Sequence, residues 1–191
     1  GRQHPELAAP FGKLRQDIAR LTALVDSLLT LARLDPLARE QLVRQQVLLA
    51  PLLEGVLALH VPQAGRRGIT LTLQCALDTV QAEPRMLEIM LRNLVENALR
   101  YCPAGSRVEI SAGWCNGRAR IAVRDNGPGV DEASRARLSE RFFRVLGQGQ
   151  GGSGLGLSIV RRIAELHGMT LGFGVGLDGR GLGVTLDLPA A

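Results

Sequence analysis

The chain has 191 residues, 46% of them hydrophobic and only 3% aromatic, so we expect one domain with an aliphatic core and a short extension. Its formal net charge of +5 comes almost entirely from arginine, since Lys13 is the only lysine. These arginines are scattered with few aromatic residues between them, which argues against nucleic-acid binding. Cys75, Cys102 and Cys115 form no CxxC pair, which argues against a disulfide framework or zinc site and for a reducing compartment.

No apolar run is long enough to span a membrane, and no signal peptide opens the chain. The longest apolar region, residues 47–61, contains Pro51 and Glu54 and is predicted to be a core helix. The chain begins with Gly1 rather than Met, so we expect it to be a piece of a longer protein whose membrane segment, if any, lies upstream.

The N-terminal region is predicted to be a loop over residues 1–10 and a helix over residues 11–34. Apolar residues alternate at spacings of four and three along this helix, as in a heptad seam: Leu14, Ile18, Leu21, Val25, Leu28 and Ala32. Such a helix cannot bury its stripe alone and needs a partner helix. Asp35-Pro36 is expected to end it.

Strands and helices then follow one another to residue 103. In order, the pattern predicts a strand at 42–49, a helix at 51–63, a turn at 65–68, strands at 69–75 and around Val80, and a helix over 87–103. Glu83-Pro84 is expected to open the last helix, because proline suits a first helical turn, and Pro103 is expected to end it.

The C-terminal half is predicted to hold two strand pairs and two helices. These are strands at 107–114 and 118–125 joined by an Asn116-Gly117 hairpin, helices at 131–138 and 153–167, and strands at 169–175 and 182–188 around Asp178-Gly179. Gly168 is expected to end the second helix in a left-handed conformation. Helices grouped with antiparallel strands predict an α+β fold, a two-layer α/β sandwich preceded by one long bundle helix.

Three polar residues follow one face of the predicted helix 87–103. Asn93 and Asn97 lie one turn apart and Arg100 follows three residues later. An amide oxygen can ligate Mg²⁺ and an arginine can bind phosphate oxygens, so this line of side chains suits a metal-phosphate ligand. The alternative is a pair of surface asparagines on an amphipathic helix.

Two glycine-rich stretches are further candidates for a binding site. Residues 147–156 run into the start of a predicted helix, where free amides and the helix dipole favour phosphate; the alternative is a plain linker. No strand directly precedes this stretch and no lysine follows it, which argues against a dinucleotide fold and a Walker A loop. Asp125-Asn126-Gly127-Pro128-Gly129 follows a strand, and its carboxylate could accept a hydrogen bond from an exocyclic amine; the alternative is an ordinary β-turn.

Taken together, the segments NLVENALRYCP, DNGPGV, RFFRV and GGSGLGLSIV resemble, in order, the N, G1, F and G2 boxes of the sensor histidine kinase catalytic domain. The resemblance covers residues 40–189 and implies the Bergerat-type ATP-binding fold shared with gyrase, Hsp90 and MutL. Helix 11–34 resembles the second helix of the dimerisation and phosphotransfer hairpin. The expected domains are therefore residues 1–36, part of that hairpin, and residues 37–191, the catalytic ATP-binding domain.

The resemblance implies a role for each matching residue. Those expected to contact the metal, the phosphates or the base are Asn97 as the Mg²⁺ ligand, Asn93 in its support, Arg100 at the phosphates, Tyr101 against the base, Asp125 at the adenine amine, and Gly127 and Gly129 around it. Phe142 and Phe143 are expected to hinge and pack the lid over ATP, and Arg144 to face the phosphates or the acceptor helix. The start of the helix on the phosphate side is expected to be formed by Gly152, Gly154, Leu155, Gly156 and Leu157, and Thr185 in the closing strand is a weaker candidate for the pocket. Asn93, Arg100 and Arg144 are the expected catalytic set.

The position four residues before Asn97 distinguishes activities within this superfamily. Its ATPases have a glutamate there to activate water, whereas this chain has Asn93, which is no general base. Glu96 is expected to be a solvated residue on another side of the helix. We therefore expect phosphoryl transfer to a histidine, with an ATPase-type switch or a non-catalytic nucleotide-binding scaffold as alternatives.

The phosphoacceptor histidine is expected to be absent from this chain. His4 lies too close to the predicted helix to sit on a preceding hairpin arm, His60 is expected to be a core residue, and His167 to cap a helix end where a cation is tolerated. The resemblance further implies a cognate response regulator, the phosphotransfer hairpin of the same or a paired chain, a homodimer in the full-length protein, and a cytoplasmic position within an inner-membrane protein.

Overall fold

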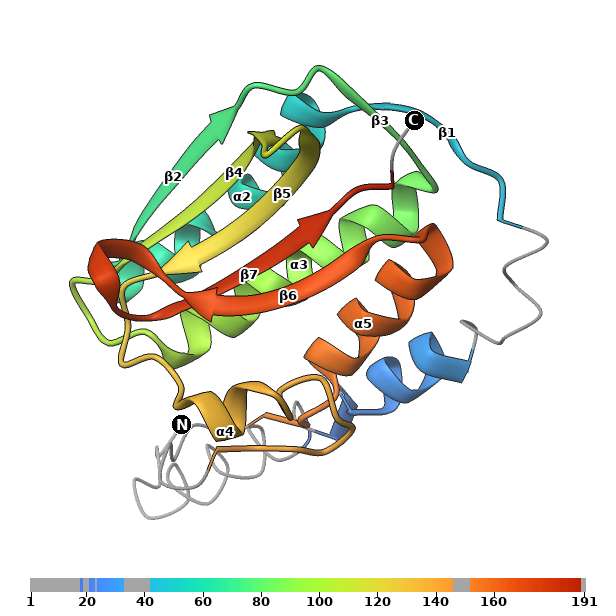
Figure 1. Cartoon of the computed structure of the whole chain (residues 1–191). Coiled ribbons are helices and arrows are strands. Elements are labelled where there is room, and N and C mark those ends of the chain that lie inside the picture. The colour runs from blue at the N-terminus through green and yellow to red at the C-terminus, as the bar shows by residue number, and fades with distance from the viewer. Residues whose placement is uncertain (1–17, 19–20, 23, 33–41, 146–151, 190–191) are drawn as a thin grey trace, which may run out of the picture.

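The computed structural model describes residues 18, 21–22, 24–32, 42–145 and 152–189 (Figure 1). Its elements are β1 (Gln45–Leu48), α2 (Leu49–Arg66), β2 (Thr70–Cys75), β3 (Thr79–Ala82), α3 (Pro84–Tyr101), β4 (Arg107–Cys115), β5 (Arg118–Asp125), α4 (Glu132–Arg135), α5 (Gly156–His167), β6 (Thr170–Val175), the short 3₁₀ turn η2 (Leu177–Gly179) and β7 (Leu182–Asp187). The predicted loop 1–10 and most of the predicted helix 11–34, with its Asp35-Pro36 end, lie outside the described residues.

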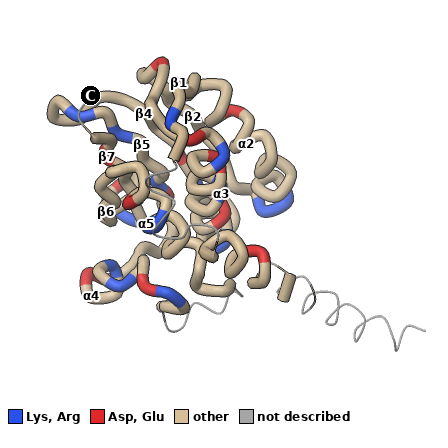
Figure 2. The backbone as a smooth tube through the Cα atoms, turned by 90° about the vertical axis from the view of Figure 1, so that its right-hand side faces the viewer, with Lys and Arg blue, Asp and Glu red and all other residues tan. Residues whose placement is uncertain are grey.

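A five-stranded sheet forms one layer and the long helices form the other. The strand order is β2-β4-β5-β7-β6, with only the β2–β4 pair parallel, while β1 and β3 form a separate antiparallel pair. Helices α2, α3 and α5 cover one face of the sheet (Figure 1), and the aliphatic core lies between the layers. This arrangement confirms the predicted two-layer α+β sandwich. Figure 2 shows the described arginines spread over many elements.

Helix α3 runs through the centre of the helical layer. Its predicted apolar stripe is confirmed, because these side chains are all buried: Leu87, Met90, Leu91, Leu94, Val95 and Ala98. The Glu83 carboxylate caps the start of the helix by accepting hydrogen bonds from the amides of Arg85 (3.2 Å) and Met86 (2.6 Å). The helix ends at Tyr101, two residues before the predicted end, because Cys102 precedes a proline and is extended.

The other predicted boundaries hold to within a few residues. The hairpin between β4 and β5 is confirmed, with Asn116 and Gly117 both at positive φ, and so is left-handed Gly168 at the end of α5. Helix α5 begins at Gly156 rather than at residue 153, because Gly154 has a φ of 69° that a helix cannot contain. Residues 47–61 mostly form α2, a core helix as predicted, but β1 occupies their start; α4 is shorter than predicted.

Residues 24–32 are helical, as predicted for this part of the chain. The side chains of Ile18, Leu21, Val25 and Leu28 are exposed, which fits the expectation that their stripe needs a partner helix. No helix in the described ranges is long and apolar enough to cross a membrane.

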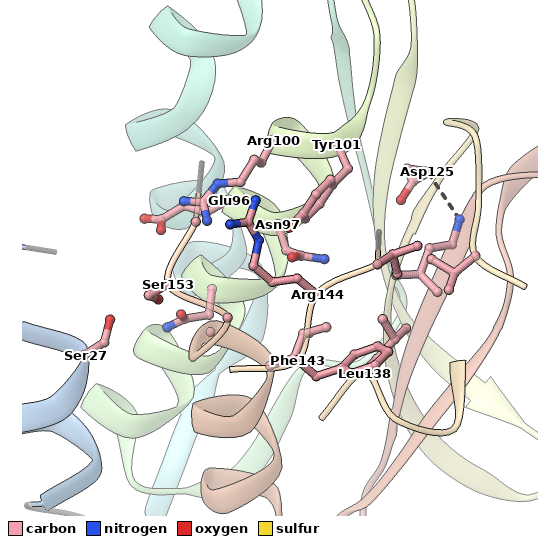
Figure 3. Close-up of a pocket in the computed structure, with 18 of the residues that line it drawn as sticks. Ser27, Glu96, Asn97, Arg100, Tyr101, Asp125, Leu138, Phe143, Arg144 and Ser153 are labelled. Atoms are coloured by element: carbon pink, nitrogen blue, oxygen red, sulfur yellow. Dashed lines mark hydrogen bonds between the residues drawn. The ribbon is translucent and has the colours of Figure 1, made fainter. Parts of the chain in front are cut away.

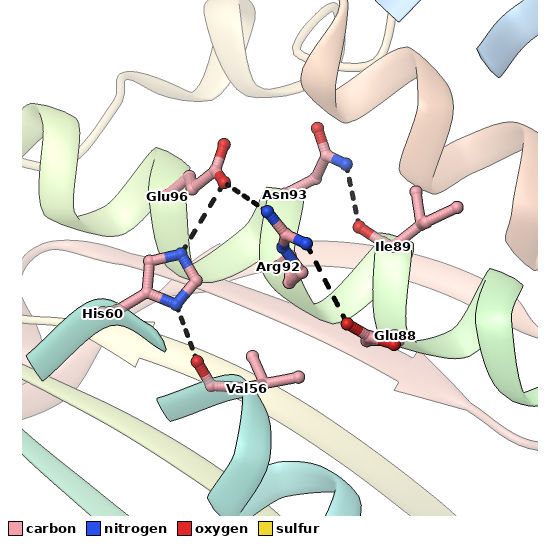
Figure 4. A network of polar contacts seen from close by, with 7 residues as sticks. All are labelled: Val56, His60, Glu88, Ile89, Arg92, Asn93 and Glu96. Carbon is pink, nitrogen blue, oxygen red and sulfur yellow. Dashed lines mark hydrogen bonds and ion pairs between the residues drawn. The ribbon is translucent and has the colours of Figure 1, made fainter. Parts of the chain in front are cut away.

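Two buried histidines tie the helical layer together. His60 is a core residue as predicted: its Nδ1 lies 2.7 Å from the Val56 carbonyl oxygen and its Nε2 lies 3.7 Å from Glu96 Oε1 (Figure 4). The Glu96 carboxylate raises the pKa of His60. The Glu96 side chain is 43% exposed, as expected for a residue on the helix surface, but it also contacts His60 and lies 4.0 Å from Arg92.

His167 caps two helix ends at once. Its Nδ1 donates to the Ile163 carbonyl oxygen (2.9 Å), which confirms the predicted capping, and its Nε2 accepts from the Glu83 amide (3.0 Å) at the start of α3. The ring is fully buried, and this burial lowers the pKa of His167. His167 is therefore neutral at pH 7, and the expectation of a tolerated cation at this position is wrong.

Acid is expected to weaken the fold through His167. Its pKa is lower in the folded state than in the unfolded chain, so its stabilising contribution is present above about pH 6.5 and is lost as the pH falls below that value. His167→Gln, which keeps a donor and an acceptor, is expected to remove this pH dependence and to cost about 1 kcal/mol at pH 8. Urea unfolding of both proteins between pH 5.5 and about 8 measures the difference.

His60→Gln is the matched control, because it must shift the pH dependence in the opposite direction. The pKa of His60 is raised in the fold, so its contribution is present below about pH 6.5 and is lost as the pH rises. Equal pH profiles for the wild type and His167→Gln would contradict the neutral, doubly bonded histidine.

Candidate functional site

A cavity of about 600 Å³ opens between α3, the loop after β5, the start of α5 and the helix at residues 24–32 (Figure 3). Most of the predicted site residues line it: Asn93, Asn97, Arg100, Tyr101, Asp125, Gly129, Arg144, Gly152, Gly154, Gly156 and Leu157. Phe143 lines it as well, whereas four other candidates do not: Gly127, Phe142, Leu155 and Thr185. The structure thus brings together three stretches that are far apart in sequence.

The polar line on α3 faces the start of α5. Asn93 Nδ2 donates to the Ile89 carbonyl oxygen (2.8 Å; Figure 4), which fixes the orientation of the amide. Its Oδ1 then lies toward Gly156, where a Cβ atom would come within 3.0 Å of it. Asn97 lies one turn further along the same face, so both amides border the cavity. The predicted common face is confirmed.

Arg100 lies against the glycine-rich segment that leads into α5. A Cβ atom at Gly152 would overlap its guanidinium, which would then have to shift. Figure 3 shows Arg100 and Arg144 directed toward the same part of the cavity from α3 and from the segment before residue 146. Together with the helix N-terminus at Gly156, these two arginines make this part of the cavity attractive to an anion.

Asp125 lies at the other end of the cavity, at the last residue of β5. Its side chain is buried, and its Oδ1 accepts hydrogen bonds from the amides of Gly127 (2.8 Å) and Leu182 (3.2 Å; Figure 3). Burial raises the pKa of Asp125, although these two amides oppose the shift. The carboxylate is thereby fixed in one orientation beside the cavity.

The Cys102 thiol borders this carboxylate from the end of α3. It is 1% exposed, and burial together with the nearby Asp125 raises its pKa to about 12. The thiol therefore stays protonated at neutral pH. A Cβ atom at Gly127 would lie 3.0 Å from Asp125 Oδ1 and 3.1 Å from Cys102 Sγ, so Gly127 leaves room behind the carboxylate instead of lining the cavity.

The β6–β7 end contributes residues that the sequence did not indicate. A Cβ atom at Gly176 or Gly181 would overlap the Asp125 carbonyl oxygen, and Leu182 both holds the carboxylate and lines the cavity. The glycine-rich pattern around residues 176–183 was the available signal. Thr185, the weaker candidate, is not among the lining residues, because its hydroxyl lies opposite Gly172.

The two phenylalanines of RFFRV lie on different sides. Phe143 lines the cavity with the Arg137 guanidinium 4.5 Å from its ring centre, whereas the Phe142 side chain is 60% exposed. The Phe142 backbone is at a φ of 63°, and its amide donates to the Gly154 carbonyl oxygen (3.0 Å). Phe142 therefore supports the glycine segment through its backbone.

Leu155 and Ser153 prepare the start of α5 in different ways. Leu155 is fully buried and anchors the segment, with its carbonyl oxygen accepting from the Ser158 hydroxyl (2.8 Å). Ser153, which the sequence analysis did not single out, lines the cavity, and its hydroxyl accepts from the Leu155 amide (3.3 Å). Leu21, Leu24 and Ser27 of the N-terminal helix also line the cavity, and no sequence pattern placed them there.

Among the described residues, no group of three or more His, Cys, Asp or Glu side chains could hold a metal ion. The amide oxygens of α3 are oxygen donors of the kind that Mg²⁺ accepts, but they would complete a coordination shell only with water or ligand oxygens. The cavity therefore fits a cation that arrives with an anionic ligand.

The family of histidine kinase-, DNA gyrase B- and HSP90-like ATPases matches residues 82–191, which is more than half of the chain. The chain belongs to this family. The sensor protein QseC of Escherichia coli K12 is 45% identical to it over 163 residues, which cover 85% of this chain and 35% of QseC. The chain thus spans about a third of the length of that curated relative.

Solved structures agree with this assignment. Full-length ShkA in complex with AMPPNP matches 99% of the chain and 40% of ShkA at 30% identity, with a TM-score of 0.78. The cytoplasmic segment of histidine kinase QseC matches 91% of the chain and 95% of that segment at 33% identity, with a TM-score of 0.61. The fold is that of an ATP-binding catalytic domain of the sensor histidine kinases.

Proposed function

We propose that this chain binds Mg²⁺–ATP in the cavity and, within a longer sensor kinase, transfers the γ-phosphoryl group to a histidine. The observation that carries the proposal is the distribution of polar groups in one cavity. A buried carboxylate, Asp125, lies at one end, and Asn97, Arg100, Arg144 and the start of α5 lie at the other. ATP has complementary groups, with the hydrogen-bond-donating amine of adenine at one end and the negatively charged phosphates at the other.

Each end of the cavity then has a defined task. The Asp125 carboxylate accepts a hydrogen bond from the adenine amine, with Tyr101 against the base and Gly129 leaving space for it. Arg100, Arg144 and the amides that begin α5 bind phosphate oxygens, and Asn97 supplies an oxygen ligand to the metal with Asn93 one turn behind it. When bound, Mg²⁺ neutralises phosphate charge and orients the phosphoryl group.

The groups around the phosphate end favour transfer over hydrolysis. Asn93 cannot accept a proton from water, and its amide is already committed to the Ile89 carbonyl. Glu96 also borders the cavity, but His60 and Arg92 hold its carboxylate on the α2 side of α3. An ATPase-type switch would require a free general base.

Among the described residues, neither His60 nor His167 suits the role of phosphate acceptor, because both are buried and hydrogen-bonded. We propose that the acceptor lies on a phosphotransfer hairpin of the same or a paired chain. The phosphoryl group would then pass to an aspartate of a cognate response regulator. In this proposal the full-length protein is a homodimer in the inner membrane, and this domain lies in the cytoplasm.

The test measures binding of a non-hydrolysable ATP analogue by calorimetry, with and without Mg²⁺. Arg100→Ala is expected to weaken binding by about tenfold or more, since a charge-assisted hydrogen bond contributes about 1.5–3 kcal/mol. Arg85→Ala, at the exposed start of the same helix and far from the cavity, is the matched control and should bind like the wild type.

The reaction itself is tested with γ-labelled ATP and a separately supplied hairpin that carries the acceptor histidine. Label on the hairpin is the expected result. Release of phosphate to water instead would favour the ATPase-type switch. Nucleotide binding with neither labelled hairpin nor released phosphate would favour the non-catalytic scaffold, and absence of any nucleotide binding would contradict the proposal.

A further inference from the structure

Arg67 connects the end of α2 to the end of α3, although it lies outside the cavity. It is the residue directly after α2, and the following Gly68 has a φ of 62°. The Gly68 carbonyl oxygen accepts a hydrogen bond from the Gly105 amide (3.1 Å), which fixes this turn beside the chain that leaves α3. The part-buried Arg67 side chain is thereby directed at the last turn of α3.

The Arg67 guanidinium binds several carbonyl oxygens at that helix end. Its Nη1 donates to the carbonyl oxygens of Leu99 and, at 3.4 Å, Arg100, and its Nη2 donates to that of Cys102 at 2.8 Å. The last carbonyls of a helix have no partner within the helix, and a positive charge there also suits the helix dipole. The guanidinium reaches these carbonyls from two separate nitrogens held in a planar fork, whereas a lysine places its three donors on one atom, so lysine is not expected to reproduce all the contacts.

The helix turn held in this way carries cavity residues at both ends of the site. Arg100 and Tyr101 belong to this turn and line the cavity, and Arg100 lies against Gly152. Cys102 follows directly, and its thiol borders the Asp125 carboxylate. A movement of this turn would therefore displace the phosphate-binding arginine and the surroundings of the base-binding carboxylate together.

We infer that Arg67 is a positioning residue for nucleotide binding: it caps the C-terminal end of α3 and so fixes Arg100, Tyr101 and Cys102 in their binding positions. The part of this inference that concerns nucleotide affinity rests on the proposed function. Arg67 does not itself line the cavity, and it acts through the backbone carbonyls that it binds.

The first experiment measures Mg²⁺–ATP-analogue affinity for Arg67→Ala and Arg67→Lys. Arg67→Ala is expected to weaken binding about tenfold, and Arg67→Lys is expected to restore only part of this loss. Millimolar guanidinium chloride should partly rescue Arg67→Ala, whereas the same concentration of sodium chloride should not. Arg66→Ala, the exposed neighbour at the end of α2, is the matched control and should bind like the wild type.

Amide hydrogen exchange of the nucleotide-free protein makes the test independent of the proposed function. Arg67→Ala is expected to speed exchange at residues 100–102 while the protection of β4, β5 and β7 stays unchanged. Unchanged exchange at these residues would overturn the inference whether or not ATP binds. Wild-type nucleotide affinity in Arg67→Ala, with the wild type itself binding, would overturn it equally, whereas no binding by the wild type would count against the proposed function alone.

Discussion

Asp125→Asn is expected to lower the affinity for a Mg²⁺–ATP analogue by at least about 100-fold, the largest loss from any single replacement in the cavity. The carboxylate accepts hydrogen bonds from two backbone amides, those of Gly127 and Leu182, and in our proposal from the adenine amine as well. A carboxamide has only one accepting atom, so its NH₂ group would face either a backbone amide or the adenine amine, and both are donors.

The choice of purine gives this experiment a second readout. Because guanine carries an oxygen where adenine carries its amine, Asp125→Asn should lose preference for the ATP analogue over the GTP analogue, in addition to affinity. Asp178→Asn is the matched control, since it makes the same change at an exposed turn residue that pairs with Arg107. Wild-type affinity and wild-type purine preference in Asp125→Asn would show that the base does not bind at this carboxylate.

The fold could be predicted from sequence because its elements are strongly patterned locally. The α3 stripe repeats at three and four residues, and the Asn116-Gly117 turn specifies its own hairpin. Boundaries were less certain, since one residue can shift them: left-handed Gly154 delays the start of α5, and extended Cys102 ends α3 early. Local patterns fix the type of an element more firmly than its last residue.

The parts of the site that could not be predicted depend on contacts between distant segments. Leu182 is 57 positions from Asp125, and Arg67 is 35 positions from Cys102, so no local pattern links either pair. The contact between Glu96 and His60 could not be predicted either, because His60 belongs to α2. Such partners become visible only when the helices and strands have been placed together.

The different positions of Phe142 and Phe143 could not be predicted from the sequence either. Two adjacent phenylalanines cannot be ranked from sequence, and the positive φ of Phe142 is what turns its side chain outward and leaves Phe143 at the cavity. The glycine-rich segment depends on that same backbone, which makes its glycines a direct test of the site.

Gly154→Ala is expected to weaken Mg²⁺–ATP-analogue binding about tenfold through two separate effects. The residue has a φ of 69°, which costs alanine about 1 kcal/mol, and its new Cβ would lie 2.9 Å from the backbone of Phe142. That contact would push the glycine segment away from Phe142 and shift the start of α5, where we propose that phosphate binds. Calorimetry of binding and urea unfolding are measured on the same preparations.

Gly168→Ala separates the two effects, because Gly168 has nearly the same φ, 70°, but no heavy atom within 4 Å of a new Cβ. It lies at the opposite end of α5, so it should lose about 1 kcal/mol of stability and bind the nucleotide analogue normally. If both variants lost stability but neither lost affinity, the glycine segment would be a structural turn and the phosphates would have to bind elsewhere. Both variants share the backbone strain, but only Gly154→Ala places a Cβ atom against Phe142. A loss of affinity in Gly154→Ala alone would therefore show that nucleotide binding depends on the close approach of residue 154 to Phe142.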